Sequence, residues 1–241
     1  MTERPYIGRE LDLFEKGTTW KRYYARRLRP WIRGRVLEVG AGIGATTPFL
    51  QHESVVSWLC LEPDPGNLIR LLERLEHLPP SVPTESRAGT LHDLPLSPAF
   101  DTILYVDVLE HIADDRGELS AARDRLRADG SIVVLAPAHR FLFSPFDAAI
   151  GHFRRYDRRM LAAVTPEGLD LVRCFYLDAA GLVASLGNRL FLQADQPTST
   201  QIRIWDRYLV RLSRILDPCL FHVVGKSVVG IWRRSRVAAA G

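Results

Sequence analysis

The run Arg-Val-Leu-Glu-Val-Gly-Ala-Gly-Ile-Gly, residues 35–44, decides the fold class of this chain. Apart from Glu38, the first half of the run is apolar from its second residue, which is typical of a buried parallel strand. Gly40, Gly42 and Gly44 follow at once, and glycine permits backbone dihedrals that other residues resist and lets a ligand approach closely. The residues beyond favour a helix. A strand, a glycine turn and a helix N-terminus together predict a nucleotide-type site in an open α/β sheet.

The glycine turn suits two cofactors. Gly40, Gly42 and Ala45 satisfy the G-x-G-x-x-G/A pattern of dinucleotide-binding proteins. Glu62 closes the next apolar run, residues 55–61, at the point where an acidic group binds ribose hydroxyls. NAD and S-adenosylmethionine both contain an adenosine ribose, so the turn and Glu62 leave both cofactors open. A glycine-rich turn without a ligand is the third possibility.

Alternating apolar runs and amphipathic segments extend over most of the chain. They predict an α/β fold with a doubly wound, mostly parallel, seven-stranded sheet, an N-terminal helix and a helical insertion before the last strand. The remaining strands are expected at residues 55–61, 82–88, 101–106, 131–136, 169–177 and 223–232. Helices are expected at residues 9–29, 45–51, 68–78, 114–128, 158–164, 179–194 and 202–216. The single domain, 1–241, divides into a helical cover (1–33), a cofactor-binding core (34–137), an acceptor-side loop and helical cap (138–220) and a last strand (221–234).

Composition narrows the class of protein. The 241 residues are 46% hydrophobic, which is ample for one core, and the net charge of +4 is spread along the chain. We therefore expect no nucleic-acid partner. Cys60, Cys174 and Cys219 form no C-x-x-C pair and are expected to be free thiols. The seven histidines form no H-x-x-x-H pattern, so no metal site is expected.

Targeting signals are not evident either. No apolar segment follows the charged start, and no uncharged run reaches the ~18–20 residues of a spanning helix. The sequence therefore predicts a cytoplasmic protein of bacterial type, without a transmembrane segment.

Four motifs in the right order give the chain a family resemblance. Residues 36–44 are similar to the first motif of class I S-adenosylmethionine-dependent methyltransferases, which have a Rossmann-like fold. Cys-Leu-Glu-Pro-Asp (60–64) resembles the second motif, and Asp-Thr-Ile-Leu-Tyr-Val-Asp-Val-Leu-Glu-His-Ile (101–112) resembles the fourth. Leu-Arg-Ala-Asp-Gly-Ser-Ile-Val-Val-Leu-Ala-Pro (126–137) resembles the turn and strand usually written L-x-P-G-G. The resemblance covers about 100 residues and implies S-adenosyl-L-methionine as cofactor.

The first two motifs imply roles in binding that cofactor. Gly40, Gly42 and Gly44 would lie beside its methionine and ribose parts. Glu38 would hold the glycine loop or the amino group of the methionine, and Glu62 would accept hydrogen bonds from the ribose hydroxyls.

The adenine side departs from the family pattern. Pro63 and Asp64 would shape the adenine site. The family often has Gly-Asp after the third strand, but here Gly89 is followed by Thr90 and Leu91, which would replace that aspartate by a hydroxyl and an apolar contact. Asp107, after the fourth strand, would face the methionine end.

The segment 138–157 contains most of the candidate acceptor-side groups. It resembles the H-x-x-L-(F/W)-S-x-x-D-x-x-x-G-H-(F/Y)-R-R-Y segment of a bacterial subgroup of these enzymes. One hypothesis makes His152 or His139 a general base while arginines hold an anionic group of the acceptor. The other makes the segment a buried polar network that shapes the loop. The candidate substrate-binding residues here are Asp147, Arg154, Arg155 and Tyr156.

Three further features bear on the acceptor. His111 follows the fourth strand and is a third candidate base, or it fixes its loop by a hydrogen bond. Trp20 and Tyr24 in the first helix either pack over the sheet or cover the cofactor and acceptor. The predicted helices from Ala179 to Leu216 are more apolar than a surface requires, so they are a packing or dimer face, or a lid for a lipid-like acceptor. The residues that carry this pattern are Leu182, Val183, Leu186, Leu190, Phe191 and Leu192.

The resemblance leads to a functional prediction. We expect methyl transfer from S-adenosylmethionine to a small-molecule or lipid-like acceptor, with or without an anionic group, in bacterial secondary metabolism or glycoconjugate formation, with O-methylation favoured. C-methylation of an isoprenoid diphosphate or polyketide-type acceptor is the alternative. The Asn/Asp-Pro-Pro-Tyr motif of amino-group methyltransferases is absent after the fourth strand. A nicotinamide-dependent oxidoreductase, for which no Tyr-x-x-x-Lys is found, and a non-catalytic adenosyl-binding protein remain as different classes.

Overall fold

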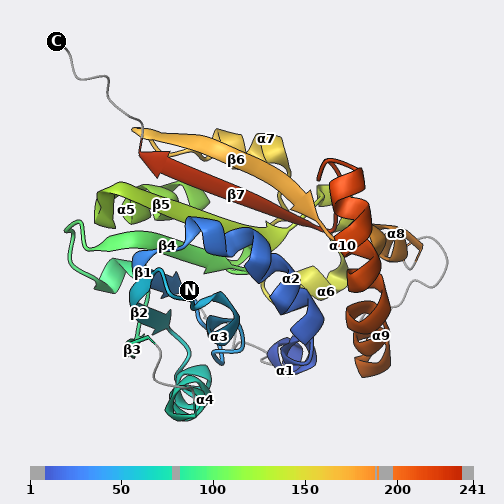
Figure 1. Ribbon diagram of the computed structural model, residues 1–241, viewed down its shortest axis with the longest axis horizontal. Helices are drawn as coiled ribbons and strands as arrows, with labels where there is room; N and C mark the ends of the chain where they lie inside the picture. Colours follow the sequence, from blue (N-terminus) through green and yellow to red (C-terminus); the bar gives the residue numbers. More distant parts are fainter. Residues whose placement is uncertain (1–8, 78–81, 188, 190–197, 235–241) are drawn as a thin grey trace.

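Seven strands form one sheet in the computed structural model, which describes residues 9–77, 82–187, 189 and 198–234 (Figure 1). Their order is β3-β2-β1-β4-β5-β7-β6, and β7 runs antiparallel to both of its neighbours. The predicted doubly wound, mostly parallel sheet is therefore confirmed. The strand bounds are β1 (Gly34–Val39), β2 (Val55–Glu62), β3 (Thr84–Ala88), β4 (Phe100–Val106), β5 (Leu126–Pro137), β6 (Leu169–Leu177) and β7 (Ser227–Arg234).

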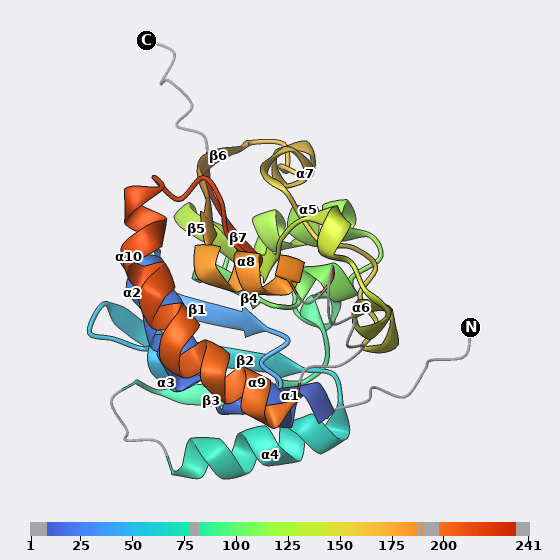
Figure 2. The ribbon, with the colours of Figure 1, turned by 90° about the vertical axis from the view of Figure 1, so that its right-hand side faces the viewer.

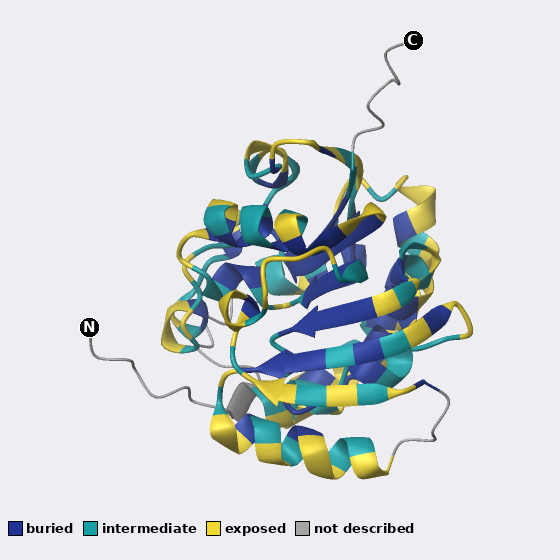
Figure 3. Cartoon of the chain, turned by 90° about the vertical axis from the view of Figure 1, so that its left-hand side faces the viewer, coloured by how far each residue is buried: buried dark blue, intermediate teal, exposed yellow. Residues whose placement is uncertain are grey.

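The sheet is buried at its centre and exposed at the β3 edge, as the burial colours show (Figure 3). β1 pairs in parallel with β2 and with β4, so that Leu37 lies opposite both Leu59 and Ile103. Because β1 to β6 share one direction, their carboxyl ends meet at one edge, where ligands of open α/β sheets bind. The glycine loop and Asp107 both lie at that edge.

Helices cover both faces of the sheet. One face packs against α2, α3 and α10, and the other packs against α5 and α7. The helix bounds are α1 (Arg9–Glu15), α2 (Thr18–Leu28), α3 (Thr47–Leu50), α4 (Pro65–Glu76), α5 (Asp115–Arg125), α6 (Pro145–Ala149), α7 (Arg158–Ala163), α8 (Ala179–Gly187), α9 (Ser199–Ile204) and α10 (Val210–Cys219). Two short elements matter below: the 3-10 turn η3 (Leu109–His111) and the π-helical turn η6 (Trp205–Leu209), which joins α9 to α10.

The predicted helix at residues 9–29 is two helices. It breaks at Gly17, and the side chain of Lys21 donates hydrogen bonds to the carbonyl oxygens of Phe14 and Glu15, at 2.7 and 3.1 Å. The ammonium group thus pairs with carbonyl groups at the end of α1, where the Phe14 carbonyl also accepts the Gly17 backbone N–H. A buried cation that ends one helix from within the next is a tertiary arrangement, which helical periodicity does not reveal.

Other boundaries differ by several residues. The helix expected at residues 45–51 is only the four-residue α3, and β5 begins at Leu126 instead of Ser131 because the backbone stays extended through the expected turn. The last strand begins at Ser227 instead of Val223. α8 ends at Gly187, and the apolar residues predicted beyond it, Leu190, Phe191 and Leu192, lie outside the described residues.

Buried carboxylates join α2 to α8 and α10 in one helical layer, in which α10 lies beside α2 (Figure 2). Asp206 in η6 accepts hydrogen bonds from the backbone N–H groups of Thr19 and Trp20 and so caps α2. Asp217 accepts hydrogen bonds from the Tyr23 hydroxyl at 2.6 Å and from the backbone N–H of Ala179 at 2.9 Å. The helical cover and the helical cap are therefore one structural unit.

Replacing Asp217 by alanine should remove this connection. We expect Asp217→Ala to lower the free energy of unfolding by about 2–4 kcal/mol, because a fully buried charged acceptor is lost and its donors stay buried. Urea unfolding followed by circular dichroism measures the change. The exposed Asp170→Ala is the control and should stay within about 0.5 kcal/mol of the wild type. Equal stabilities of the two variants would contradict the role given to Asp217.

Candidate active site

The glycine loop after β1 requires its glycines for steric reasons. Gly40, Gly42 and Gly44 have φ angles of +65°, +58° and +71°, a region that residues with a side chain rarely adopt. A Cβ atom on Gly40 would lie 2.8 Å from the Val108 side chain, and one on Gly44 would lie 2.7 Å from Leu71. On Gly42 it would meet only Leu11 of α1, at 3.6 Å. The loop thus presents bare backbone, with α1 above its middle glycine.

Glu62 holds this loop to the end of β2. Its carboxylate accepts hydrogen bonds from the backbone N–H of Gly42 at 2.7 Å and of Asp64 at 3.1 Å. Only 5% of Glu62 is exposed, and this burial raises the pKa of its carboxyl against the lowering effect of the two N–H donors. A carboxylate oxygen has lone pairs for two donors, so Glu62 can orient the loop and still accept a ribose hydroxyl.

Glu38 is a buried anchor at the end of β1. One of its oxygens, Oε2, accepts hydrogen bonds from the Thr47 hydroxyl at 2.7 Å and from the Trp58 indole N–H at 2.8 Å. Burial raises the pKa of Glu38 from 4.5 to about 7, against the opposing effect of these donors. Since Thr47 begins α3, these contacts support the prediction that Glu38 holds the loop.

The adenine side has the departure noted in the sequence. Leu91 is fully buried, whereas Thr90 and Pro63 are exposed. The Thr90 hydroxyl donates to Asp93 at 2.9 Å, and the Thr90 backbone N–H donates to the same oxygen at 2.7 Å. Thr90 and Asp93 thus form a capping box.

Asp107 lies where the cover, the strand ends and the 138–157 segment converge. Its side chain reaches solvent, yet the surrounding protein crowds it and raises its pKa to about 6. The positive charges of His152, Lys21, Lys226 and Arg155 act in the opposite direction. Burial also lowers the pKa of Lys21, to about 8. The site therefore combines acidic and basic groups that titrate close to neutral pH.

Backbone strain marks the same edge of the sheet. Asp107, His139 and Asp178 follow β4, β5 and β6, and each has a positive φ, of 54°, 68° and 71°. A left-handed conformation costs a residue with a side chain about 1–2 kcal/mol and persists only where the surrounding structure requires it. Such residues cluster at functional sites, which supports placing the site at the ends of β4 to β6.

His111 and His152 are neighbours in space. Their ring centroids lie 4.5 Å apart and the rings are nearly perpendicular, at 83°. Burial, together with the charge of His152, lowers the pKa of His111 to about 4, so that its imidazole is neutral at physiological pH. His152 pairs through Nδ1 with Asp147 Oδ1 at 2.9 Å. Since an ionised carboxylate only accepts, Nδ1 of His152 carries a proton, and its Nε2 lies on the side of Glu110, 3.8 Å from Oε1.

The rest of the G-H-F-R-R-Y segment forms an internal polar network. Arg155 donates to both oxygens of Asp147, at 2.9 and 3.0 Å. Burial opposes ionisation of Asp147, but the donors His152 and Arg155 outweigh it and hold its pKa at about 2. Arg154 pairs with Asp115 at 2.5 Å, and the Tyr156 hydroxyl donates to Asp115 at 2.7 Å. These contacts favour the second hypothesis, a buried network that shapes the loop, and contact of these four residues with the acceptor stays a prediction.

His139 lies apart from the other two histidines in its contacts. Its ring stacks against Phe141 and Tyr176, with centroids 5.0 and 4.9 Å away, and its Nε2 lies 2.9 Å from the carbonyl oxygen of Gly225. Its own contacts therefore secure the turn after β5 and give it less support as a base than His111 or His152 have.

The two aromatic residues of α2 have different surroundings. The Tyr24 hydroxyl lies 3.0 Å from the Thr46 hydroxyl in the glycine loop, and the charges of Asp107 and Glu38 act on it. Trp20 packs against Tyr24 and Trp205, with ring centroids 5.3 and 5.8 Å away. Tyr24 therefore reaches the site, while Trp20 packs behind it.

The arrangement fits a bound adenosyl cofactor: a side-chain-free loop after β1, an acid at the end of β2 and another at the end of β4. Comparison with known proteins gives the same class, because residues 37–132 match the family model described as Methyltransferase domain. Residues 37–132 are thus similar to the methyltransferase domain family. The glycine loop, Glu62 and Asp107 stay the predicted residues for S-adenosylmethionine.

Individual relatives are distant from this chain. The ubiquinone biosynthesis O-methyltransferase of Azorhizobium caulinodans is 29% identical over 111 residues, which are 46% of this chain and 43% of that protein. The fold is shared with a geranyl diphosphate methyltransferase in complex with SAM (TM-score 0.65, 14% identity, covering 97% of this chain and 93% of that one). It is also shared with a putative sarcosine dimethylglycine methyltransferase from Galdieria sulphuraria (TM-score 0.59, 17% identity, 90% and 84%).

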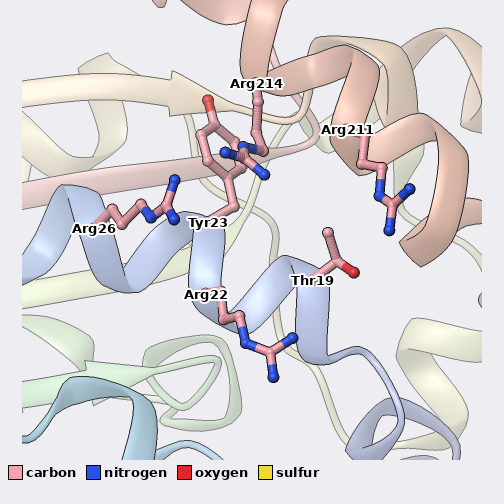
Figure 4. A pocket seen from close by; sticks show the side chains of 6 residues that line it. All are labelled: Thr19, Arg22, Tyr23, Arg26, Arg211 and Arg214. Carbon is pink, nitrogen blue, oxygen red and sulfur yellow. The ribbon is translucent and has the colours of Figure 1, made fainter.

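Two further features of the chain are its lack of a described membrane-spanning helix and a hollow between α2 and α10. No helix in the described part of the chain is long and apolar enough to cross a membrane. A hollow of about 130 Å³ lies between α2 and α10, away from the strand ends, and arginines from both helices point toward it (Figure 4). Its lining residues are Thr19, Arg22, Tyr23, Arg26, Arg211 and Arg214.

Substitution of Gly40 tests the glycine loop. We expect Gly40→Ala to weaken binding of S-adenosylhomocysteine at least about tenfold, because the new methyl group meets Val108 and the positive φ disfavours alanine. Isothermal titration calorimetry measures the affinity. Gly168→Ala is a matched control, since Gly168 also has a positive φ but nothing lies within 4 Å of its Cβ position. This control should cost stability and leave the affinity unchanged; equal affinity losses would contradict the prediction.

Glu38 should make the protein less stable as pH rises, whereas an ion-paired carboxylate makes a protein more stable as pH rises. Its folded pKa, about 7, lies above the ordinary 4.5, so the folded state binds the proton more tightly. The free energy of unfolding then falls as pH rises from about 4.5 to about 7 and is unaffected by Glu38 at higher pH. Glu38→Gln removes this titration, so its stability should fall by about 3 kcal/mol less than that of the wild type over this range.

Urea unfolding at pH 5, 6, 7 and 8 measures this difference. Glu53→Gln, at an exposed position, serves as the control and should follow the wild type. Parallel pH profiles for Glu38→Gln and the wild type would show that Glu38 has an ordinary pKa in the folded protein.

Proposed function

We propose that the chain transfers the methyl group of S-adenosylmethionine to an oxygen atom of a small-molecule or lipid-like acceptor. The observation that carries this proposal is the juxtaposition of His111 and His152 at the end of β4, beside Asp107, whose φ angle is positive. A hydroxyl acceptor needs a base near the transferred methyl, and a neutral imidazole supplies one at physiological pH.

The roles of the residues follow from their contacts. When bound, S-adenosylmethionine supplies an activated methyl group on a sulfonium sulfur. Glu62 would bind the ribose hydroxyls through the lone pairs that its N–H partners leave, and Asp107 would face the methionine end. The protein then has to align the acceptor within about 3–3.5 Å of the methyl carbon. His152 is the favoured base, because Asp147 fixes the orientation of its ring.

Several observations favour an apolar acceptor. The cap exposes apolar side chains on α8, α9 and α10 and beyond, including Val183, Ile204, Ile215 and Phe221.

The relative from ubiquinone biosynthesis is an O-methyltransferase, which supports an oxygen atom as the methyl acceptor. The geranyl diphosphate methyltransferase keeps C-methylation of an isoprenoid diphosphate as the alternative. We further propose a cytoplasmic protein of bacterial secondary metabolism or glycoconjugate formation, and the exposed apolar face makes a homodimer the natural oligomer to test.

Calorimetric titration with S-adenosylhomocysteine, NAD and NADP is the first test. We expect binding of S-adenosylhomocysteine alone, weakened about 10–100-fold in Glu62→Gln, because a charged acceptor for the ribose hydroxyls is worth about 1.5–3 kcal/mol. Glu85→Gln, on the exposed edge strand β3, is the control and should bind as the wild type does.

An acceptor screen with a labelled methyl group follows. His152→Asn should lower methylation of a hydroxyl acceptor by about 100-fold or more while leaving cofactor affinity unchanged, since the base acts only on the acceptor. Binding of NAD without S-adenosylhomocysteine would overturn the proposal in favour of an oxidoreductase. Cofactor binding without transfer to any acceptor tested, and with His152→Asn unchanged in every property, would favour a non-catalytic adenosyl-binding protein.

A further inference from the structure

Three metal-type donors from two separate segments meet beside Asp107. Glu110 and His111 belong to η3, directly after β4, and His152 follows α6, about 40 residues later in the chain. One ligand atom from each of the three lies within 4.8 Å of the other two. A hydrogen bond from the Phe153 backbone N–H to the Glu110 carbonyl oxygen, at 2.8 Å, holds the two segments together.

Glu110 is the unusual member of this group. The residue is fully buried, and neither carboxylate oxygen has a hydrogen-bond partner among the residues that the structure describes. Nε2 of His152 lies 3.8 Å from Oε1, which is too far for a hydrogen bond. A buried carboxylate without a partner costs several kcal/mol, so a native protein compensates it with a bound cation or a bound proton.

His152 is prepared as a ligand. Its Nδ1–H points at Asp147, and Asp147 is itself held by both nitrogens of the Arg155 side chain, at 2.9 and 3.0 Å. The other ring nitrogen of His152, Nε2, lies on the side of Glu110, 3.8 Å from Oε1. A carboxylate that orients a histidine from behind is the usual support of metal-bound histidines.

We infer that Glu110, His111 and His152 form a binding site for a divalent transition-metal ion. Two imidazole nitrogens and one carboxylate oxygen make a set that suits zinc, iron, cobalt or manganese better than magnesium or calcium. Ligand atoms around such an ion lie about 3.0–3.5 Å apart, so the three side chains need to close by only about 1 Å. Three protein ligands leave positions on the ion open.

The open positions point to the acceptor. This part of the inference rests on the proposed function, because it takes the acceptor to be a hydroxyl bound at the end of β4. An oxygen coordinated to a divalent cation is held in place and becomes more acidic. With its Nε2 on the ion, His152 would act as a ligand and not as the base, and the acidified hydroxyl would lose its proton to water. An acceptor with two neighbouring oxygens, which can chelate the ion, is the substrate class that this site favours.

No metal site was expected from the sequence, because histidine spacing along one helix gives no signal for this cluster. Here the proposed ligands come from two segments and one of them is a glutamate. Glu110 and His111 are adjacent in the chain, but His152 joins them only through the fold.

Metal binding can be measured without any acceptor. After chelator treatment and gel filtration, the full chain should bind Co²⁺ with a stoichiometry of one, followed by the visible absorption of the bound ion and by calorimetry. Zn²⁺ should compete for the same site and raise the midpoint of thermal unfolding. We expect His152→Ala and Glu110→Gln each to weaken binding at least 100-fold, and Asp147→Asn to weaken it about 10–100-fold. His77→Ala, an exposed histidine outside the cluster, is the control and should bind as the wild type does.

Binding of S-adenosylhomocysteine is measured on every variant, which separates this inference from the proposed function and shows that each variant is folded. Absence of stoichiometric metal binding in a wild type that binds S-adenosylhomocysteine would overturn the metal site and leave the methyltransferase assignment intact. Metal binding that survives in both Glu110→Gln and His152→Ala would overturn it too. If either variant fails to bind S-adenosylhomocysteine, His111→Gln replaces it, with the same loss of Co²⁺ absorption expected.

Discussion

A single buried carboxylate at the end of β1 fixes the part of the structure on which the site depends. Glu38 accepts hydrogen bonds from Thr47 in α3 and from Trp58 in β2, so one side chain joins β1, α3 and β2. The loop between β1 and α3 then has little freedom, and its glycines take up the left-handed conformations that this path requires. Glu62 completes the arrangement from β2 by accepting the N–H of Gly42. The cofactor loop is thus held from within the sheet.

A second set of carboxylates controls what lies above the sheet. Asp206 and Asp217, in the α9–α10 region, accept hydrogen bonds from α2 and from the start of α8. Asp178 adds the Trp205 indole and the Ser213 hydroxyl to the same layer. Through these bonds the C-terminal helices position Tyr24 and Lys21 of α2 toward Asp107 and the glycine loop. Substitutions in the cap helices would therefore change the positions of residues at the cofactor side as well as at the acceptor side.

The charged residues of segment 138–157 do not by themselves indicate an acceptor site, because most of them pair with one another or with neighbouring elements. Arg154 pairs with Asp115 and so fastens the segment to α5, while Arg155 pairs with Asp147 inside the segment itself. Buried arginine–carboxylate pairs of this kind cost much when broken, which suits a structural role. What the network contributes to chemistry is the placement of His152, whose ring it orients beside His111 and Glu110.

The sequence by itself determined the fold class, and it predicted the cofactor and the candidate residues at the ends of β1, β2 and β4, because local patterns carry that information. An apolar run followed by glycines at alternate positions has few other physical solutions, and ligand residues at the carboxyl ends of parallel strands necessarily meet at one edge. The first helix was predicted as one piece, although it is two, because the buried Lys21 that ends α1 acts across a turn.

Only the tertiary structure decided the partners of the polar residues. It assigned Arg154 and Arg155 to nearby carboxylates, separated His139 from His152, and left the Glu110 carboxylate buried without a hydrogen-bond partner among the described residues. Hydrogen bonds and ion pairs act over about 3–4 Å in space, whatever the separation in the chain, so spacing along the sequence cannot assign them. The fold could be predicted because periodicity is local, and the chemistry of the acceptor side could not because its partners are not.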